Sequence, residues 1–141
     1  MTTTVSVESA PPDFLENIRV GRHQLQADEP VSAGGSDAAP TPYELLLAAL
    51  GSCKVVTLRM YAKRKSWPLK AVHVKLSHAK VHAEDCADCE KPQSMIDRIY
   101  REIEFIGVLD AEQRSRLLEI ADHCPVHRTL SAKIDIKTTA V

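Results

Sequence analysis

The sequence lacks a long hydrophobic run and a clear excess of either charge. Its longest unbroken apolar stretch, Leu45 to Leu50, has six residues, whereas a membrane-spanning helix needs about 20. The 18 basic and 19 acidic residues leave a formal net charge of −1, which gives no electrostatic reason to expect a nucleic-acid or membrane partner. The first residues, MTTTVSVESAPPDF, have neither the basic start nor the apolar centre of a secretory signal. We therefore predict a cytoplasmic protein.

Cysteines are few, and the chain is long enough not to need disulfides for stability. A domain of 141 residues buries about two thirds of the surface that its unfolded chain exposes. No repeat or low-complexity tract divides the sequence, so we expect one domain over residues 1–141. In the cytosol, the four cysteines at positions 53, 86, 89 and 124 are expected to be free, catalytic or metal-bound.

The N-terminal third of the chain predicts β-strands. Alternating or loosely alternating segments cover residues 2–9, 14–20 and 23–28, and Gly21-Arg22 is a plausible two-residue hairpin loop. The segment after them, PVSAGGSDAAP, carries a glycine pair and proline flanks, which are typical of a connection.

A long apolar helix is predicted over residues 41–64. Thr41 is a suitable N-cap, Pro42 suits the first helical position, and Glu44 lies three residues after the cap. Between Glu44 and Ala62 the helix is apolar on nearly all sides, so protein should enclose it. A single short chain can hardly cover every side, and we therefore expect a homodimer.

The second half of the chain predicts two strands, a helix and a final strand. Residues 71–83 alternate with period two, and residues 96–108 alternate as well, although the first part of this second segment could also be helical. A helix should begin at Asp110 and stop near Cys124, because Pro125 disfavours a helical conformation of the residue before it. Residues 133–139, KIDIKTT, predict a closing strand.

Two of the cysteines lie on predicted helices. Cys53 shares a helix face with apolar residues, and burial as a small core residue is one interpretation of it. Gly51 and Ser52 favour a second interpretation, a functional thiol, because small neighbours let another backbone or a substrate approach it closely. Cys124 should lie at the negative end of a helix dipole, which disfavours a thiolate. If the two cooperate, Cys53 should attack and Cys124 should resolve the sulfenic acid to a disulfide.

For Cys53 to ionise in apolar surroundings, a cation must offset its desolvation. Lys54 is adjacent in sequence but lies about 100° round the helix, so it is not expected to reach the sulfur. The candidate cations are basic residues of the predicted hairpin and of the segment after Cys124: Arg19, Arg22, His127 and Arg128.

The motifs PTPYELLLAALGSC and ADHCPVHRTL, with DEPVSAGG ahead of the helix, resemble the OsmC/Ohr family of thiol peroxidases. This resemblance implies an α+β fold in which antiparallel sheets wrap central helices in an intertwined homodimer. It implies reduction of organic hydroperoxides to alcohols, with electrons from a dithiol such as a lipoylated protein and no required cofactor. By the matching motifs, Cys53 is the peroxidatic residue and Cys124 the resolving one.

Two positions depart from the family pattern. The best-known members place a glutamate directly after the helix-opening proline, where it pairs with an active-site arginine. Tyr43 stands there in this chain, and Glu44 follows one residue later with a capping role of its own. The family arginine would fall at residues 11–13, which hold none, so Arg19 and Arg22 are substitutes by proximity. The alternative function is a non-catalytic dimeric module that binds a small apolar ligand or a metal.

Apolar side chains near Cys53 would form the substrate site. Leu46, Leu50 and Met60 lie on its helix face, with Tyr43 near the mouth. Burial of an alkyl group against them would favour an organic hydroperoxide over hydrogen peroxide.

The second cysteine pair suggests a zinc site. Cys86 and Cys89 are two residues apart in an acidic segment, and His82 precedes them, so these three could hold a metal. His78 is too far along the strand to share the ion easily. The other interpretation is a solvent-exposed acidic loop with two reduced thiols.

Overall fold

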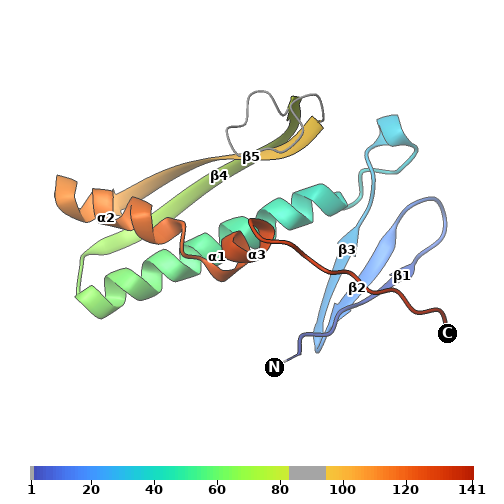
Figure 1. Cartoon of the computed structure of the whole chain (residues 1–141). Coiled ribbons are helices and arrows are strands. Elements are labelled where there is room, and N and C mark those ends of the chain that lie inside the picture. The colour runs from blue at the N-terminus through green and yellow to red at the C-terminus, as the bar shows by residue number, and fades with distance from the viewer. Residues whose placement is uncertain (1, 83–94) are drawn as a thin grey trace. The chain divides into compact units, whose positions relative to one another are not determined.

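A computed structural model describes residues 2–82 and 95–141 (Figure 1). The chain divides into two compact units, residues 1–48 and residues 49–141, and each is described by itself. That the whole chain forms one domain stays a prediction.

The first unit contains a three-stranded antiparallel sheet in the order β1-β2-β3. Its strands are β1 (Ser6–Ser9), β2 (Glu16–Val20) and β3 (His23–Ala27). Val20 pairs with His23 across the two-residue turn, and Gly21 has a φ of 57°, which glycine adopts at no steric cost. The three predicted strands and their hairpin loop are therefore confirmed, with shorter ends.

A buried carboxylate organises the connection after β3, which includes the short helix η1 (Val31–Ala33). Asp28 accepts backbone N–H groups from Glu29 at 2.8 Å, Ser36 at 3.3 Å and Ala38 at 3.1 Å. These hydrogen bonds hold the pKa of Asp28 below its ordinary value, and the bond from Ala38 has the largest effect. A Cβ on Gly35 would lie 2.0 Å from the carbonyl oxygen of Glu29, so the close turn around Asp28 needs glycine.

This arrangement predicts acid-sensitive stability. The pKa of Asp28 is lower in the folded than in the unfolded chain, so its stabilisation is fully present above the unfolded value of about 4 and is lost as the pH falls through the folded value. Asp28→Asn should lower the thermal midpoint at pH 7 and differ less from wild type near pH 3, as followed by circular dichroism. Glu8→Gln, at an exposed position of the same unit, is the control. An equal difference at both pH values would contradict the role of the Asp28 charge.

Helix α1 (Pro42–Lys65) starts as its sequence predicts. The Thr41 hydroxyl accepts the Glu44 N–H at 3.2 Å, and the Glu44 carboxylate accepts the Thr41 N–H at 3.0 Å, which is the predicted capping box. By length and composition α1 could cross a membrane, with a mean hydropathy of 1.4 over 18 residues. The core helix of a soluble protein passes the same test, so one such helix is weak evidence for a membrane location.

In the second unit, a long hairpin packs against α1. Strands β4 (Leu69–His82) and β5 (Met95–Gly107) are antiparallel, so the first part of the second segment is a strand and not a helix. Helix α2 (Ala111–Ala121) begins with a capping box formed by Asp110 and Gln113. The core joins α1, both strands and α2 through seven buried residues: Leu58, Tyr61, Val72, Phe105, Leu117, Ile120 and Ala121.

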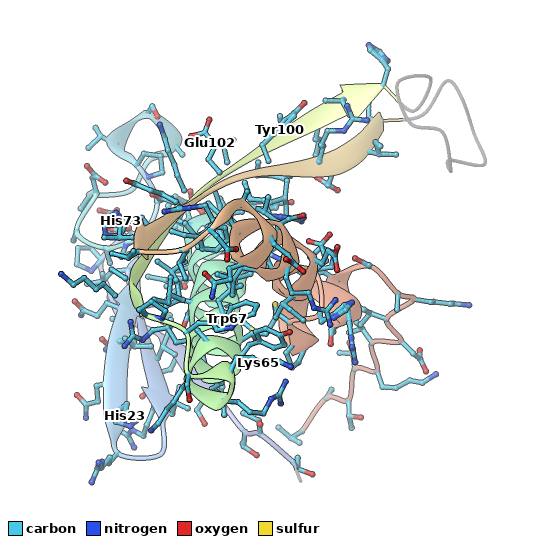
Figure 2. All side chains as sticks on the ribbon, turned by 90° about the vertical axis from the view of Figure 1, so that its left-hand side faces the viewer. His23, Lys65, Trp67, His73, Tyr100 and Glu102 are labelled. Atoms are coloured by element: carbon cyan, nitrogen blue, oxygen red, sulfur yellow. The ribbon has the colours of Figure 1, made fainter. Side chains whose placement is uncertain are left out.

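The two faces of the hairpin differ as the alternation of its sequence predicts. Val72 pairs with Phe105 and both are buried in the core. Tyr100 and Glu102 point from β5 away from α1 (Figure 2), and both are exposed. One face of the hairpin therefore carries the packing against α1.

Two predictions for the C-terminal part are wrong. The helix after Asp110 ends at Ala121, and Cys124 is the N-cap of a further helix, α3 (Pro125–Leu130). Proline suits the first turn of a helix, so Pro125 begins α3 as well as preventing the continuation of α2. Residues 133–139 have no regular structure, because an alternating segment becomes a strand only when another strand supplies its hydrogen bonds.

Candidate functional site

The structure brings Cys53 and Cys124 together. Cys53 lies partly exposed in the middle of α1, and Cys124 is fully buried between α2 and α3. Both are free thiols. Burial raises the pKa of the Cys124 thiol, and the nearby Cys53 adds to this effect. The protonated form of the Cys124 thiol is therefore favoured.

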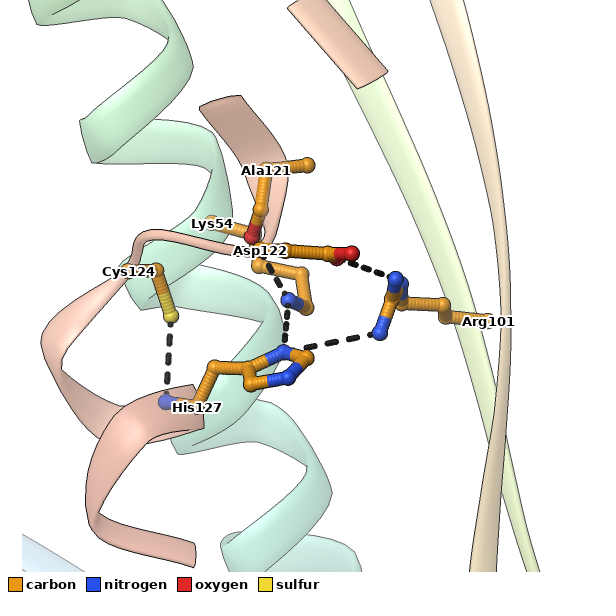
Figure 3. A network of polar contacts seen from close by, with 6 residues as sticks. All are labelled: Lys54, Arg101, Ala121, Asp122, Cys124 and His127. Atoms are coloured by element: carbon orange, nitrogen blue, oxygen red, sulfur yellow. Dashed lines mark hydrogen bonds and ion pairs between the residues drawn. The ribbon is translucent and has the colours of Figure 1, made fainter. Parts of the chain in front are cut away.

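The surroundings of Cys124 explain why its thiol stays protonated. Its Sγ accepts the backbone N–H of His127 at 3.3 Å (Figure 3), which lowers the pKa, as does the charge of Lys54. Burial is the largest effect and raises the pKa of Cys124 overall. The predicted neutral thiol thus follows from burial, and the predicted position at the negative end of a helix is wrong.

Lys54 is one of the residues that the sequence prediction did not place in the site. Its side chain is 0% exposed, and its Nζ donates to the Ala121 carbonyl oxygen at 2.8 Å and contacts His127 Nδ1 at 2.8 Å (Figure 3). The charge of Lys54 acts on Cys124 and lowers the pKa of its thiol. Although the ammonium is on a neighbouring face of α1, its long flexible stem reaches the ends of α2 and α3.

The pKa of Lys54 is lower than its ordinary value. Burial is the main cause, and the positive charge of Arg101 adds to it. Three acidic groups oppose this and raise the pKa of Lys54: Cys124, Asp122 and Cys53. A sequence signal existed, because Lys54 is the one charged residue between Glu44 and Arg59, and a charge on an enclosed apolar helix needs partners.

His127 reaches the site, but as an acceptor. Its Nδ1 faces Lys54 Nζ at 2.8 Å and Arg101 Nη1 at 3.4 Å. Burial, followed by the charges of Lys54 and Arg101, lowers the pKa of His127. The ring is therefore neutral at pH 7, with its proton on the other nitrogen.

Arg101 enters the site from β5. It pairs with Leu76 of β4 in the register of the hairpin, and its guanidinium forms an ion pair with Asp122 at the end of α2 (Figure 3). Its position follows the same two-residue period as Ile99 and Ile103, so Arg101 replaces an apolar residue on the face toward α1. A charged residue at an otherwise apolar position of the alternation was the sequence signal that could have indicated Arg101.

Gly51 has a packing role next to the cysteine pair. It is buried, and a Cβ there would lie 2.8 Å from Leu76 Cδ1 of β4. The small residue thus lets α1 approach the hairpin closely, which explains a glycine inside this helix.

The other predicted site residues have separate places. Arg19 lies on β2 and Arg22 in the β2–β3 turn, both in the first unit, so their role toward Cys53 stays a prediction. Glu44 hydrogen-bonds with Thr41, which leaves it a structural role in the capping box.

Of the predicted substrate-binding residues, Leu50 lines a cavity beside the site. This cavity has a volume of about 250 Å³ and is lined by both apolar and polar residues: Leu50, Asp97, Ile99, Arg101, His127, Leu130 and Ser131. Met60 lines a different hollow together with Arg59 and Trp67. Tyr43 and Leu46 are exposed near the start of α1. Binding of a peroxide by any of them stays a prediction.

The proposed zinc site cannot be placed. Cys86 and Cys89 lie outside the described residues, and His82 is the exposed last residue of β4. Within residues 2–82 and 95–141, no group of three potential metal ligands occurs.

The fold and the site define a small α+β protein in which a partly exposed thiol and a buried thiol lie near a buried lysine. Residues 34–139 match the family described as OsmC-like protein, and the chain belongs to this family. A search among curated proteins found no match.

Solved structures share this fold at low sequence identity. An OsmC like protein from Mycoplasma pneumoniae has a TM-score of 0.73 and 14% identity, over 93% of this chain and 88% of that chain. An organic hydroperoxide resistance protein OsmC from Legionella pneumophila has a TM-score of 0.67 and 19% identity, over 97% of this chain and 94% of that chain. An organic hydroperoxide resistance protein from Elizabethkingia anophelis has a TM-score of 0.66 and 16% identity, over 92% of this chain and 87% of that chain. The predicted α+β OsmC-like fold is confirmed.

Proposed function

We propose that this protein reduces organic hydroperoxides to alcohols through Cys53 and Cys124. The observation that carries the proposal is the placement of the partly exposed Cys53 near the buried Cys124, close enough for Cys53 to act on the pKa of Cys124, because resolution of an oxidised cysteine needs a second sulfur nearby. Partial exposure of Cys53 gives a peroxide access to the sulfur, while the buried Cys124 stays protonated.

The chemistry has three balanced steps. The Cys53 thiolate attacks one peroxide oxygen, the O–O bond breaks, and the departing alkoxide takes up a proton and leaves as the alcohol. Cys53 is then a sulfenic acid, and attack by the Cys124 sulfur forms a disulfide and releases water. An external dithiol, such as a lipoylated protein, returns both cysteines to the reduced form and becomes a disulfide itself.

Two supports come from outside the cysteine pair. The chain belongs to the OsmC-like family, and neighbours of similar fold are named organic hydroperoxide resistance proteins. The apolar residues Leu50, Ile99 and Leu130 in the adjoining cavity could take the alkyl part of a substrate.

We also propose a cytoplasmic homodimer. Val56 and Met60 are exposed on α1, and burial of such apolar surface against a second copy would be favourable. Residues 133–139 offer an alternating segment that a partner strand could complete.

The direct experiment follows consumption of cumene hydroperoxide by the reduced protein with dithiothreitol. We expect many turnovers per protein and, without dithiothreitol, a stoichiometric loss of the Cys53 and Cys124 thiols with formation of their disulfide. Native protein whose thiols survive an equimolar amount of the hydroperoxide would contradict the proposal.

A non-catalytic binding module is the second candidate, and one observation favours it. Glu44 is engaged by Thr41 in the capping box, and Tyr43 stands at the family glutamate position. This candidate requires a Cys53 that stays inert toward iodoacetamide at pH 7.

A further inference from the structure

The connection between α2 and α3 is held on both sides by one side-chain atom. Helix α2 ends at Ala121, and residues 122–124 lead from it to α3. Lys54 Nζ donates to the Ala121 carbonyl oxygen at 2.8 Å, before the connection, and contacts His127 Nδ1 at 2.8 Å, after it (Figure 3). Lys54 therefore ties the end of α2 to the first turn of α3.

These contacts continue to the sulfur of Cys124. Cys124 is the N-cap of α3, and its Sγ accepts the backbone N–H of His127 at 3.3 Å. His127 is thus bound twice, by Cys124 through its backbone and by Lys54 through its ring. Lys54, Ala121 and Cys124 are each 0% exposed, so water does not compete for their hydrogen bonds. The position of the Cys124 sulfur is therefore linked to that of the Lys54 ammonium.

Packing alone gives no reason for a lysine at this position. Burial of an ammonium is costly, and replacement of a buried charged group by an apolar one of similar size is often neutral or stabilising. Lys54 follows Cys53 directly on α1. Hydrogen bonds are directional, whereas apolar contacts are not. A hydrogen-bonded lysine can therefore fix how the connection with Cys124 lies against the turn of α1 that carries Cys53.

We propose that Lys54 and His127 are positioning residues for Cys124: their hydrogen bond holds the buried sulfur in the place from which it resolves an oxidised Cys53. The proposal deepens the proposed function and rests on it for the resolving step. His127 Nδ1 is the acceptor in this contact, because Arg101 Nη1 also faces it at 3.4 Å and neither cation can accept a hydrogen bond. Residue 127 therefore has to supply an acceptor at the position of Nδ1, and no charge.

Two matched pairs of variants remove or keep this hydrogen bond. His127→Leu removes the acceptor, whereas His127→Asn keeps a side-chain oxygen that can accept from Lys54. Because both leave Lys54 in place, they separate geometry from charge. Lys54→Met removes the donor, and Lys63→Met makes the same change at an exposed position of α1. Circular dichroism identifies the variants that fold.

The first test measures how well Cys124 is protected, and it needs no peroxide. Each variant is combined with Cys53→Ser and treated with iodoacetamide, and modified Cys124 is quantified by mass spectrometry. His127→Leu and Lys54→Met should raise the rate of Cys124 modification at least about tenfold, because loss of a tertiary contact makes local opening easier. His127→Asn and Lys63→Met should match the Cys53→Ser parent.

The second test equilibrates the proteins with reduced and oxidised glutathione. Oxidised glutathione forms a mixed disulfide with one protein thiol and releases one glutathione, and attack by the second protein sulfur forms the Cys53–Cys124 disulfide and releases the other. The ratio of the two protein forms gives the effective concentration of Cys124 at Cys53, which should fall at least about tenfold in His127→Leu and Lys54→Met. His127→Asn and Lys63→Met should match wild type.

A folded His127→Leu that matches its parent in either test would overturn the proposal, as would a loss confined to Lys54→Met. If His127→Leu and Lys54→Met both fail to fold, His127→Asn decides. A folded asparagine variant with an unprotected Cys124 and a low effective concentration would show that the acceptor does not position the sulfur.

The outcomes also separate this proposal from the proposed function. If wild type does not reduce cumene hydroperoxide but His127→Leu lowers the effective concentration, the positioning role stands and the function is wrong. If wild type reduces the hydroperoxide and His127→Leu changes neither test, the positioning role is wrong and the function stands. If both are right, His127→Leu should consume its first equivalent of peroxide at the wild-type rate and then form the disulfide at least about tenfold more slowly. General destabilisation would not produce that split between the two steps.

Discussion

Replacement of Cys53 by serine should abolish hydroperoxide reduction, whereas replacement of Cys124 should stop it after one turnover. A hydroxyl at position 53 cannot form the thiolate that attacks the peroxide, so at least about 10³-fold of the activity should be lost. In Cys124→Ser, attack by Cys53 remains possible, but the resolving sulfur is absent. The sulfenic acid should therefore accumulate in an amount equal to the protein.

The measurement is a burst experiment with limiting cumene hydroperoxide and no dithiol. Wild type and Cys124→Ser should each consume about one equivalent, and a dimedone adduct at Cys53 should appear in the variant alone. Ser52→Ala, at an exposed position of α1, controls for changes in the helix. A full burst in Cys53→Ser, or a burst without sulfenic acid in Cys124→Ser, would show that the order of the two cysteines is wrong.

The largest stability effect should come from Leu117→Ala on α2. Leu117 is 0% exposed in the core between α1, the hairpin and α2. Removal of a buried leucine side chain loses its transfer free energy and leaves a cavity, which typically lowers the free energy of unfolding by about 2–5 kcal/mol. Urea unfolding monitored by circular dichroism measures this loss.

The adjacent residue provides a matched control. Leu118 is 52% exposed on the same helix, so Leu118→Ala should change the free energy of unfolding by only about 0.5 kcal/mol or less. Both substitutions replace leucine by alanine within α2, so they change the intrinsic helix propensity by the same amount. Equal losses in the two would mean that the face of α2 assigned to the core is wrong.

Local signals were sufficient for the start of α1 and for the β2–β3 hairpin. Thr41 and Glu44 bind each other's backbone groups within one turn, and the Gly21-Arg22 loop needs only the conformational freedom of glycine. Such interactions depend on residues close in sequence, so their patterns predict them. The resemblance of the cysteine motifs to the OsmC/Ohr family likewise indicated the family before any coordinates.

Tertiary structure decided what surrounds the thiols. The chain order gives no reason for Lys54 to meet the Ala121 carbonyl or for Arg101 to reach Asp122, because these contacts join elements that are distant in sequence. It also decided that Cys124 begins α3 and that its burial, not a helix dipole, keeps the thiol protonated.

By itself, the sequence determined the start of α1 and the β2–β3 hairpin, since each depends on neighbours along the chain. Only the folded arrangement decided which charge lies beside the sulfurs and that residues 133–139 remain without a strand partner among the described residues. The physical reason is the same in both cases. Electrostatic interactions and strand pairing act between residues that are distant in sequence. Their strength depends on burial and distance in the folded protein, which sequence separation does not give.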